Sequence, residues 1–555
     1  MRLSTNFTKT SRDFPSDEMS RNAQLLIKAG FIHKAMAGVY AYLPLGLRVL
    51  GKIENIVRKN MNKIGGQEIL MNSLHPKLWW DKTDRWDADK VDVLFRLESQ
   101  TKSQYALACS HEEQVVPIVM SFASSYRDLP DYVPGISGKV SHLFSNPEEN
   151  CIAISTANFS DWVHLKKLFV GQKVSLILTS EGSSIKHIKI IKIEKSTNSS
   201  LTEYKEYDNL EVNIDYIRAG QQILIKYEKI TDSDFLNSTF PLSVYQIQTK
   251  FRDELRSKSG IMRGREFRMK DMYDFHLSQE SADNYYELVK QTYFQIFTEM
   301  GLVAFAVHAS GGMFTNNDSH EFQVICEAGE DEIFYDLEDE SNEKWAVNAE
   351  VLEELKEKNN KIPQKLQKAK SAEVGNIFKL GDKYTKSFDF KVANSENKQV
   401  FPIMNCHGIG VSRCMGVIAE IYSDEMGLKW PESVTPFQFH IISGSSKNSQ
   451  INQKIQTLAK DIYDGQLKLV KQNNQIKILN PNNLAELSKF VLSDLQSTEN
   501  EILWDDRENI SIGQKLKDAD LIGCPHQIII TEKSLENDGI EIKNRTTGKV
   551  LVVQI

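Results

Sequence analysis

Cysteine is scarce in this sequence and widely spaced. The chain has 555 residues but only 6 cysteines, and no two of them form a Cys-x-x-Cys pair. Disulfide-stabilised domains and zinc ribbons both depend on closely spaced cysteines. We therefore expect reduced thiols and exclude both of these classes.

Long hydrophobic runs are missing as well. No apolar stretch approaches the roughly 18–20 residues that a membrane helix needs. The first residues are polar and include acids, without the apolar segment that is typical of a signal peptide. We expect a cytoplasmic protein that does not span a membrane.

The sequence has no excess of basic residues and lacks three familiar motifs. Its formal net charge of -8 provides no general attraction to polyanions, although a local basic patch remains compatible with it. No Walker A sequence occurs, and Gly408-Ile-Gly410 is followed by Arg413 where the dinucleotide fingerprint has a third glycine. SHEEQ (110–114) and SHEFQ (319–323) lack the second histidine of a zinc protease, which disfavours that class.

The overall composition is that of a large globular protein. Hydrophobic residues make up 41% and charged residues 26%, which excludes wholesale disorder. At this length the chain should contain about three to five folding units.

Apolar spacing predicts both helices and strands. Residues 22–62 have mostly helical spacing, interrupted by an irregular segment at 42–46. Further strands are expected at 65–76, at 105–109 and in a strand-loop-strand block at 244–276, and further helices at 112–126 and 280–300.

Three later segments differ in texture. Residues 131–240 contain short apolar runs between Ser, Asn and Gly clusters, which predicts a β-rich inserted module. Residues 337–372 are dominated by charges, which is typical of a solvated face or a linker. After residue 431, strands alternate with helices near 450–464, 482–495 and 512–520, which predicts an α/β domain with a substantially parallel sheet.

The segment 245–275 carries the most informative side chains. Arg252 and Glu254 are two residues apart, so they would share one face of an extended strand. A loop then leads to Arg263 and Phe267. Arginine binds phosphate, glutamate accepts from an adenine amino group and phenylalanine offers a stacking face, so the set suits a nucleotide. An exposed hairpin with ordinary surface ion pairs is the alternative.

A second candidate segment is NCHGIGVSRCMG (405–416). Its two glycines precede a helix that bears Arg413, a plausible phosphate ligand, although glycines that let a helix pack closely are a simpler explanation. Cys406 beside His407 suggests a nucleophile and its base. Neighbours on a strand point to opposite faces, which disfavours that reaction.

These segments resemble a known family. FRDE (251–254), RGREF (263–267) and GIGVSR (408–413) resemble motifs 2 and 3 of class II aminoacyl-tRNA synthetases. Stretches such as LWWDKTDRW (78–86) and IGCPHQIII (522–530) are similar to bacterial-type prolyl-tRNA synthetases. The likeness extends over nearly the whole chain outside the two atypical segments.

The resemblance implies an α+β fold: an antiparallel catalytic sheet flanked by helices, followed by an α/β anticodon-binding domain. The catalytic core would comprise 1–130 and 241–435, with the β-rich insertion of unknown role at 131–240. The anticodon-binding domain would comprise 436–555. Residues 337–372 would be a short charged remnant where the family usually carries a long editing domain.

The resemblance also implies ATP and Mg²⁺ as cofactors, with Mg²⁺ held mainly through ATP by protein ligands that are unknown. Arg252 matches the motif 2 arginine at the α-phosphate and the amino-acid carboxylate, and Arg413 matches the motif 3 arginine at the γ-phosphate. These two arginines are the implied catalytic residues. In-line attack on a phosphorus depends mainly on positioning and charge neutralisation, which arginines supply.

The remaining nucleotide contacts follow from the same motifs. Glu254 matches the residue near the adenine amino group, Arg263 the residue at the outer phosphates, and Phe267 the adenine-stacking aromatic. Glu321 and Gln323 are weaker candidates for metal or ribose contacts.

For the amino acid, Ser110 and Glu112 match the Thr-x-Glu loop that binds the proline imino group, and His320 matches a histidine lining the pocket. Cys109-Ser110 replaces the usual Pro-Thr, and the serine keeps the hydroxyl. Asn72 stands where a proline usually closes motif 1, which leaves a homodimer implied but its local geometry less secure.

For tRNA, the resemblance implies that the anticodon is read by the last domain. Candidate residues are Asp505, Asp506 and Arg507 in a turn and Lys517 near a helix start. The segment 543–553 is expected to fold as a hairpin instead.

The implied activity is that of a proline–tRNA ligase acting on L-proline, ATP and tRNA(Pro). Binding alone discriminates weakly against a smaller amino acid. Without a long editing domain we therefore expect no clearing of alanyl-tRNA in cis, and either a free-standing deacylase or tolerance of the error. A class IIa synthetase for another amino acid is one alternative. A synthetase-like protein that binds tRNA without aminoacylation is another, which the intact Arg252, Glu254 and Arg413 disfavour.

Overall fold

The structure is a computed structural model. It describes residues 1–130, 241–255, 259–309, 319–336, 345–353, 362–363, 365–467, 501–537 and 539–554, together with strand backbones between 139 and 229 and between 468 and 479. The helix expected at 482–495 lies outside the described residues.

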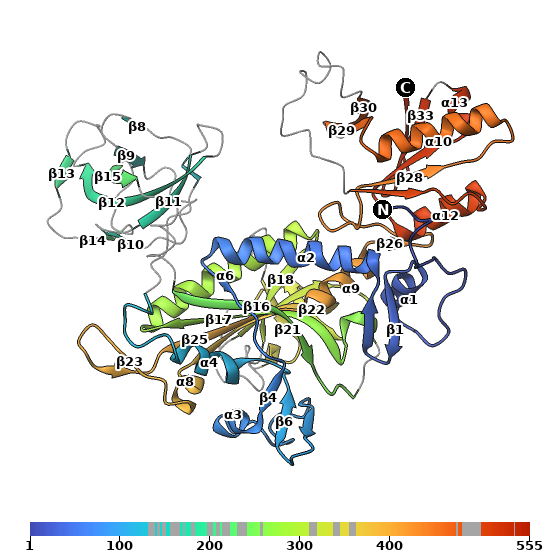
Figure 1. Cartoon of the computed structure of the whole chain (residues 1–555). Helices are drawn as coiled ribbons and strands as arrows, with labels where there is room; N and C mark the ends of the chain where they lie inside the picture. Colours follow the sequence, from blue (N-terminus) through green and yellow to red (C-terminus); the bar gives the residue numbers. More distant parts are fainter. Residues whose placement is uncertain are drawn as a thin grey trace.

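A nine-stranded, mainly antiparallel sheet is the centre of the larger part of the molecule (Figure 1). Its order is β19-β18-β21-β20-β22-β25-β17-β16-β3. Among the described pairings, β3 with β16 and β18 with β21 are parallel, and the others are antiparallel. The strands are β3 (Gln67–Glu68), β16 (Leu242–Phe251), β17 (Glu266–His276), β18 (Ala304–Ala309), β19 (Ser319–Ile325), β20 (Asp331–Asp336), β21 (Ala346–Asn348), β22 (Leu366–Gly381) and β25 (Ile403–Ile409).

Helices cover both faces of this sheet, as Figure 1 shows. Apolar residues of α2, α6 and α9 belong to one core cluster on one face of the sheet. Apolar residues of α4 and α8 belong to a separate cluster on the other face. Val49, Ile53 and Val57 recur every four residues, which places them on a single buried stripe. The helices are α2 (Pro44–Lys63), α6 (Gln279–Glu299) and α9 (Val411–Ile421) on one face, and α4 (Glu112–Met120) and α8 (Lys383–Ser387) on the other.

The N-terminal segment differs from the prediction of helix interrupted only at 42–46. A β-hairpin, β1 (Ile32–Met36) with β2 (Val39–Tyr42), separates α1 (Arg21–Lys28) from α2. Gly38 turns this hairpin with a φ of 75°, a conformation that glycine adopts without steric cost. Each strand is so short that its alternation of buried and exposed side chains could not be recognised between the two helical segments.

The other predicted elements of the core are present with shifted ends. The strand-loop-strand block and the following helix appear as β16, β17 and α6. The helix predicted at 112–126 is shorter, since α4 ends at Met120. The two early strands are β4 (Leu74–Pro76) and β6 (Gln104–Leu107), which pair with each other.

The C-terminal part has its own five-stranded sheet of order β31-β28-β32-β33-β34. The first three strands are parallel, as the alternation of strands and helices predicts, and the last two form the antiparallel terminal hairpin. The elements are β28 (Phe439–Ser443), α10 (Ser449–Tyr463), β31 (Ile502–Asp505), α12 (Ile512–Ile522), β32 (His526–Ile530), β33 (Gly539–Asn544) and β34 (Val550–Gln554).

Two atypical segments have distinct relations to the sheets. Between 139 and 229, strand backbones form a separate sheet of order β7-β11-β12-β15-β9-β8, with β13 paired to β12. These strands are β7 (Lys139–Val140), β8 (Ser145–Asn146), β9 (Cys151–Ser155), β11 (Lys173–Leu178), β12 (Ser184–Ser196), β13 (Tyr204–Glu206) and β15 (Gln222–Lys229). Within 337–372, by contrast, β21 and the first residues of β22 belong to the central sheet. That segment is therefore partly integral to the core and is not only a charged remnant.

The described cysteines and helices bear on two sequence predictions. Cys109, Cys326, Cys406, Cys414 and Cys524 are buried and free, while the side chain of Cys151 lies outside the described residues. In the part of the chain that the structure describes, no helix is long and apolar enough to cross a membrane.

Candidate active site

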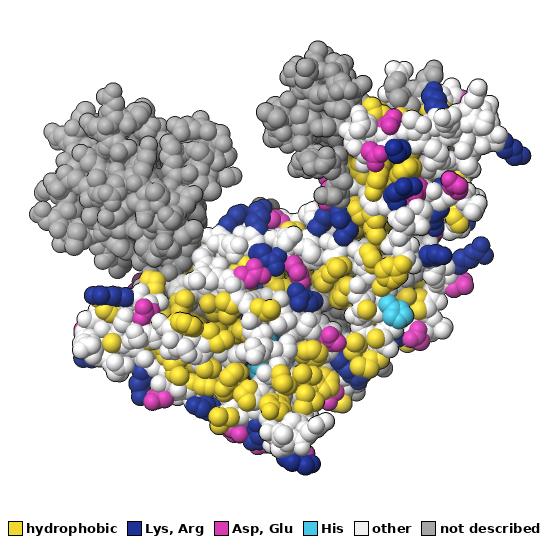
Figure 2. Space-filling model, in the orientation of Figure 1, with side chains coloured by type: hydrophobic (Ala, Val, Ile, Leu, Met, Phe, Trp, Pro, Cys, Tyr) yellow, Lys and Arg dark blue, Asp and Glu magenta, His cyan; other side chains and the backbone are white. Residues whose placement is uncertain are grey.

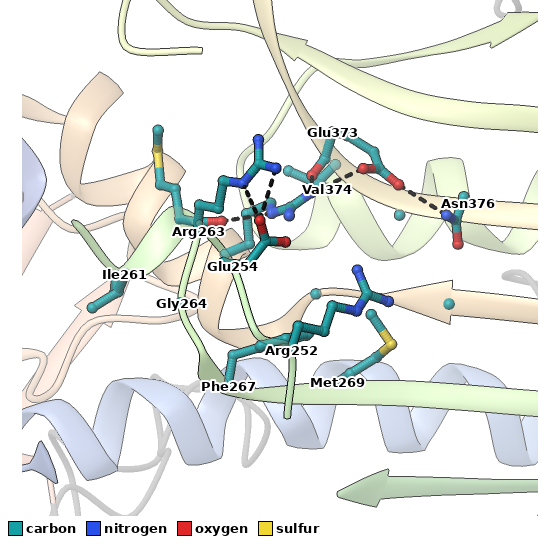
Figure 3. A pocket seen from close by; sticks show the side chains of 15 residues that line it. Arg252, Glu254, Ile261, Arg263, Gly264, Phe267, Met269, Glu373, Val374 and Asn376 are labelled. Carbon is teal, nitrogen blue, oxygen red and sulfur yellow. Dashed lines mark hydrogen bonds and ion pairs between the residues drawn. The ribbon is translucent and has the colours of Figure 1, made fainter. Parts of the chain in front are cut away.

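A cleft with an empty volume of about 510 Å³ opens at the end of the β16–β17 hairpin (Figure 3). Phe251 pairs with Glu266 at the last position of the strand register, and Met262 and Arg263 of the connecting segment line the cleft. The start of α9 and the middle of β22 close the opposite side. The polar and aromatic residues that line the cleft are Arg252, Glu254, Arg263, Phe267, Glu373, Asn376 and Arg413.

Arg252 and Phe267 lie next to each other at the end of the hairpin. The Arg252 guanidinium carbon is 5.3 Å from the centroid of the Phe267 ring. The Arg252 backbone N–H donates to the Arg265 carbonyl at 2.9 Å, which closes the hairpin. A cation and an aromatic face therefore border the same space.

Arg263 is held by two carboxylates. It donates to Glu254 Oε2 from Nε at 3.0 Å and from Nη2 at 2.8 Å, and from Nη1 to Glu330. Glu254 was expected near an adenine amino group, but its carboxylate is engaged by Arg263 instead. Both partners are on or near the surface of the cleft, so an anion that attracts Arg263 would release Glu254.

Arg413 lies in the first turn of α9 and also has an acidic partner. Its Nη1 donates to Glu373 Oε2 at 3.0 Å and to the Glu373 carbonyl at 2.8 Å, and its Nε donates to the Met262 carbonyl at 2.7 Å. Gly416 allows this close approach, because an added Cβ would lie 2.7 Å from Met262 Cγ. The short helix-to-loop distance thus fixes where Arg413 points.

The Ser110–Glu112 loop lies on the same face of the sheet as the cleft. The Ser110 hydroxyl donates to Glu112 Oε2, and the Cys406 thiol donates to Glu112 Oε1 at 3.2 Å. Glu112 begins α4, where the helix dipole favours negative charge. His407 points to the other face and contacts Asp274 at 2.5 Å, so Cys406 and His407 do not form a nucleophile and base.

Buried charges around Glu112 do not balance. On this face Glu112, Glu113 and Asp271 are fully or almost fully buried carboxylates. Arg85 lies 2.6 Å from Glu113 and 3.6 Å from Glu112, and Lys250 lies 2.6 Å from Asp271. Among the buried residues that the structure describes, three formal negative charges thus face two positive ones, and the exposed Lys383 also lies near Glu112 and Glu113. A buried excess of negative charge favours a cationic ligand.

Glu321 and Gln323 form an oxygen-rich group beside Glu373. Gln323 Nε2 donates to Glu321 Oε2 and to Asp331 Oδ2, each at 3.0 Å. Burial, together with the nearby Glu373 and Asp331 charges, raises the pKa of Glu321 to about 8. The buried Gln323 carbonyl oxygen has no hydrogen-bond partner among the described residues.

This oxygen-rich group suits Mg²⁺, which prefers carboxylate and carbonyl ligands. Among the described residues no three His, Cys, Asp or Glu side chains are close enough to hold a metal by themselves. Mg²⁺ commonly binds through one or two carboxylates plus substrate phosphates, so the residues present fit an ion that arrives with a nucleotide.

His320 does not line this site, which corrects its predicted role. Its Nδ1 is 2.8 Å from the Tyr286 hydroxyl on α6. Phe322, two residues along β19, packs against Tyr293 of the same helix. Side chains two apart share a face, so His320 lies on the α6 side while Glu321 and Gln323 lie on the cleft side. The sequence could not indicate which face α6 covers.

Two of the predicted anticodon-reading residues, Asp505 and Asp506, are buried. Asp505 is buried and receives two hydrogen bonds from the Arg507 side chain at 2.8 and 2.6 Å. Asp506 is also buried and bonds Arg2 at 2.5 Å and the Ser4 hydroxyl at 2.6 Å. The two carboxylates are therefore structural groups, which corrects their predicted role.

Sequence reasoning did not find several residues that complete the site. Glu330 and Glu373 partner the cleft arginines, and Arg85 and Lys250 compensate the buried acids. Lys250 stands two residues before Arg252 in the predicted strand, and this position was the sequence feature that could have indicated its role. The other three come from distant segments without a distinctive motif.

Family models match two parts of the chain. Residues 226–422 match the tRNA synthetase class II core domain (G, H, P, S and T), and residues 474–555 match an anticodon binding domain. These matches confirm the fold class that the motifs predicted.

Relatives match over almost their full length. A proline–tRNA ligase of Wolbachia sp. subsp. Brugia malayi is 30% identical over all of this chain and 98% of its own length. One from Ehrlichia chaffeensis is 29% identical over all of this chain and 97% of its own.

Solved structures show the same fold. Giardia lamblia prolyl-tRNA synthetase in complex with prolyl-adenylate superposes with a TM-score of 0.59 at 15% identity, covering 98% of this chain and 77% of that one. The Cryptosporidium parvum enzyme with halofuginone and AMPPNP has a TM-score of 0.58 at 11% identity, covering 96% and 74%. The motifs, the family models and the full-length relatives agree, and the chain belongs to the proline–tRNA ligase family of class II aminoacyl-tRNA synthetases.

Proposed function

We propose that the chain activates L-proline with ATP and transfers the prolyl group to the 3′ end of tRNA(Pro). The observation that carries this proposal is the cleft lined by Arg252, Phe267 and Arg413. The buried carboxylate of Glu112 accepts from Cys406 of β25, the strand whose Gly408 lines the same cleft. The names of the full-length relatives and the prolyl-adenylate in the Giardia lamblia structure support it.

In the first step, a proline carboxylate oxygen attacks the α-phosphorus of ATP in line, and pyrophosphate leaves. Arg252 binds the α-phosphate and the proline carboxylate, Arg413 binds the γ-phosphate, and Phe267 stacks on adenine. Arg263 moves from Glu254 and Glu330 to the outer phosphates, which frees Glu254 for the adenine amino group. The groups act by orientation and by stabilising developing charge.

Mg²⁺, bound mainly through the phosphates, supplies further charge neutralisation of the leaving pyrophosphate. Glu321, Gln323 and Glu373 are the residues that would hold it, because they present oxygen atoms on the cleft side of the sheet. Their crowded negative charge is compensated when the cation is present.

Glu112 and Ser110 bind the secondary amine of proline. A cationic amine supplies the positive charge that the buried groups on this face lack. The resulting hydrogen bond is charge-assisted and therefore stronger than a neutral one. Ser110 keeps the hydroxyl that the usual threonine would supply, and this hydroxyl donates to Glu112. Cys109, which replaces the usual proline, is buried beside it.

The anticodon of tRNA(Pro) contacts the C-terminal part of the chain. Lys517 is exposed on α12, and Arg507 is partly exposed beside it. Lys517 and Arg507 remain the proposed tRNA contacts, and Asp505 and Asp506 position the turn.

The proposed domains are a catalytic core at 1–130 and 241–435, an insertion at 131–240, and an anticodon-binding domain at 436–555.

The chain acts as a cytoplasmic homodimer without editing in cis. Exposed apolar side chains gather on the face that carries α4, α8 and β4 (Figure 2). Leu70 is 75% exposed, Leu74 49% and Phe122 83%, and a partner subunit would cover these side chains.

Because 337–372 carries no long editing domain, alanyl-tRNA is left to a free-standing deacylase or is tolerated.

Proline-dependent exchange of labelled pyrophosphate into ATP tests the proposal. We expect exchange with proline and Mg²⁺, and its loss in Arg252→Ala. Exchange with a different amino acid alone would assign the chain to another class IIa specificity. No exchange with any amino acid would favour a tRNA-binding protein.

A further inference from the structure

His111 stands between the two proposed proline-binding residues, and three hydrogen bonds hold it. Its backbone N–H donates to the Tyr273 hydroxyl at 3.1 Å, Lys250 Nζ lies 2.7 Å from its Nδ1, and its Nε2 lies 2.9 Å from the Asn72 carbonyl oxygen. A carbonyl oxygen only accepts, so Nε2 carries the ring hydrogen and Nδ1 accepts from Lys250. Together these bonds fix the tautomer and the orientation of the ring.

Asp271 joins two of these partners. Lys250 Nζ lies 2.6 Å from Asp271 Oδ1, and the Tyr273 hydroxyl donates to Oδ2 at 2.9 Å. Lys250 and Tyr273 are 0% exposed and Asp271 is 3% exposed. A buried ion pair is weak evidence for stability, because desolvation offsets much of its attraction. A polar network with its bonds made does, however, restrict its members to one geometry.

The network also reaches the segment before β4. Gln246 donates to Asp271 Oδ2 at 3.0 Å and accepts from the Met71 backbone N–H at 2.9 Å. Gln248 donates to the Met71 carbonyl at 3.0 Å. The β16 strand thereby fastens the 71–72 backbone on one side of His111, while β17 fastens the other side through Tyr273.

We propose that Lys250, Asp271 and Tyr273 are positioning residues for proline. Acting through His111, they hold Ser110 and Glu112 where the carboxylate meets the amine of the substrate. None of the three lines the cleft at Arg252, so they do not touch the nucleotide. The inference rests on the proposed function, because it assumes that Glu112 binds the amine.

Tyr273→Phe is the sharpest test, because it removes one hydroxyl and keeps the buried ring. Tyr293→Phe is its matched control. Tyr293 is also 0% exposed, and its hydroxyl accepts from Lys270 Nζ at 2.5 Å, but on the α6 face of the same sheet. Tyr273→Phe removes the buried hydrogen bonds to the His111 N–H and to Asp271, and Tyr293→Phe removes the buried bond to Lys270. Only Tyr273→Phe should disturb the Ser110–Glu112 loop.

The full-length variants are compared by pyrophosphate exchange and by thermal unfolding. We expect Tyr273→Phe to raise KM for proline at least roughly tenfold, because two buried hydrogen bonds are lost, with KM for ATP within about twofold of wild type. Tyr293→Phe should leave both constants unchanged. The combined Lys250→Met, Asp271→Asn variant removes both charges together and should give the same selective rise, which provides a second reading if Tyr273→Phe does not fold.

Two results would overturn the inference alone. One is an active wild type with an unchanged KM for proline in the Tyr273→Phe and Lys250→Met, Asp271→Asn proteins. The other is a parallel rise of both KM values that follows the loss of thermal stability, as in a purely structural role. A wild type with no proline-dependent exchange contradicts the proposed function itself, and the inference with it.

Discussion

Arg545 donates hydrogen bonds to both carboxylate oxygens of Asp424, from Nη1 at 2.9 Å and from Nη2 at 2.7 Å. Asp424 belongs to the part of the chain that follows α9, and Arg545 follows β33 of the C-terminal sheet. The Arg545 side chain is 1% exposed. One bidentate ion pair therefore joins the two parts of the molecule that would bind the acceptor end and the anticodon of a tRNA.

Arg545→Met should destabilise the junction between these parts. The substitution breaks both charge-assisted hydrogen bonds to Asp424, while Lys429 still lies 3.0 Å from that carboxylate, so we expect a loss of about 2 kcal/mol of unfolding free energy. Denaturant unfolding measures the loss. Arg58→Met is the control, because Arg58 bonds Glu68 in the same bidentate way at 2.7 and 2.9 Å but both side chains are about one-third exposed. A surface pair should contribute less than about 1 kcal/mol. Equal losses in the two variants would contradict the prediction.

Glu112→Gln should selectively weaken proline binding. The substitution keeps the shape of the side chain but removes the charge that would meet the amine, so KM for proline should rise about 10- to 100-fold. KM for ATP should change little. Glu113→Gln serves as the comparison, since Glu113 bonds Arg85 and the Thr83 hydroxyl. It should lower thermal stability while KM for proline stays close to wild type; the reverse pattern would exchange the roles of the two acids.

Lys270→Met should change the pH dependence of stability. Burial lowers the pKa of Lys270 from 10.5 to about 7. Between these values the unfolded chain binds a proton that the folded chain does not, so this group makes stability rise with pH by up to about 1.4 kcal/mol per unit. The variant should lose that slope between pH 7 and 10, as measured by urea unfolding. Unchanged slopes would show that Lys270 keeps its proton in the fold.

Glu321→Gln should flatten the pH dependence of Mg²⁺ activation. Since the pKa of Glu321 is raised to about 8, the group is mainly protonated at pH 6 and increasingly charged toward pH 8. A nearby cation favours the charged form, so the apparent Mg²⁺ affinity should rise with pH across this range, at most about tenfold per unit. His320→Asn is the control on the opposite face. Burial, with nearby His308 and lysines, lowers the pKa of His320 to about 3, so that side chain stays neutral throughout. A wild-type affinity independent of pH would contradict the prediction.

The shared position of the hairpin residues in one cleft was predictable because these residues are close in sequence. Arg252, Glu254, Arg263 and Phe267 lie within one hairpin, and the register of β16 with β17 brings them to the same cleft. Their carboxylate partners were not predictable. Glu330 and Glu373 come from segments more than 60 residues away in sequence, just before β20 and within β22, and no spacing rule links them to the hairpin.

The alternation of side chains along a strand also shows what the sequence alone cannot decide. Along β19 the alternation of side chains was readable, so His320 and Glu321 had to point to opposite faces. Which of the two faces the cleft depended on where α6 packs, and that is set by burial of aromatic residues from distant segments. The same holds for Asp506, whose carboxylate is taken by residues at the start of the chain.

By itself, the sequence determined the family, the order of the main elements and the group of hairpin residues that line the cleft, because motifs and periodicity are short-range properties of the chain. Only the tertiary structure decided which charges compensate one another, which face each strand residue takes, and how Lys250 and Asp271 reach the Ser110–Glu112 loop through His111. Those relations arise from contacts between segments distant in sequence. Their pairing is selected by the packing of the whole fold.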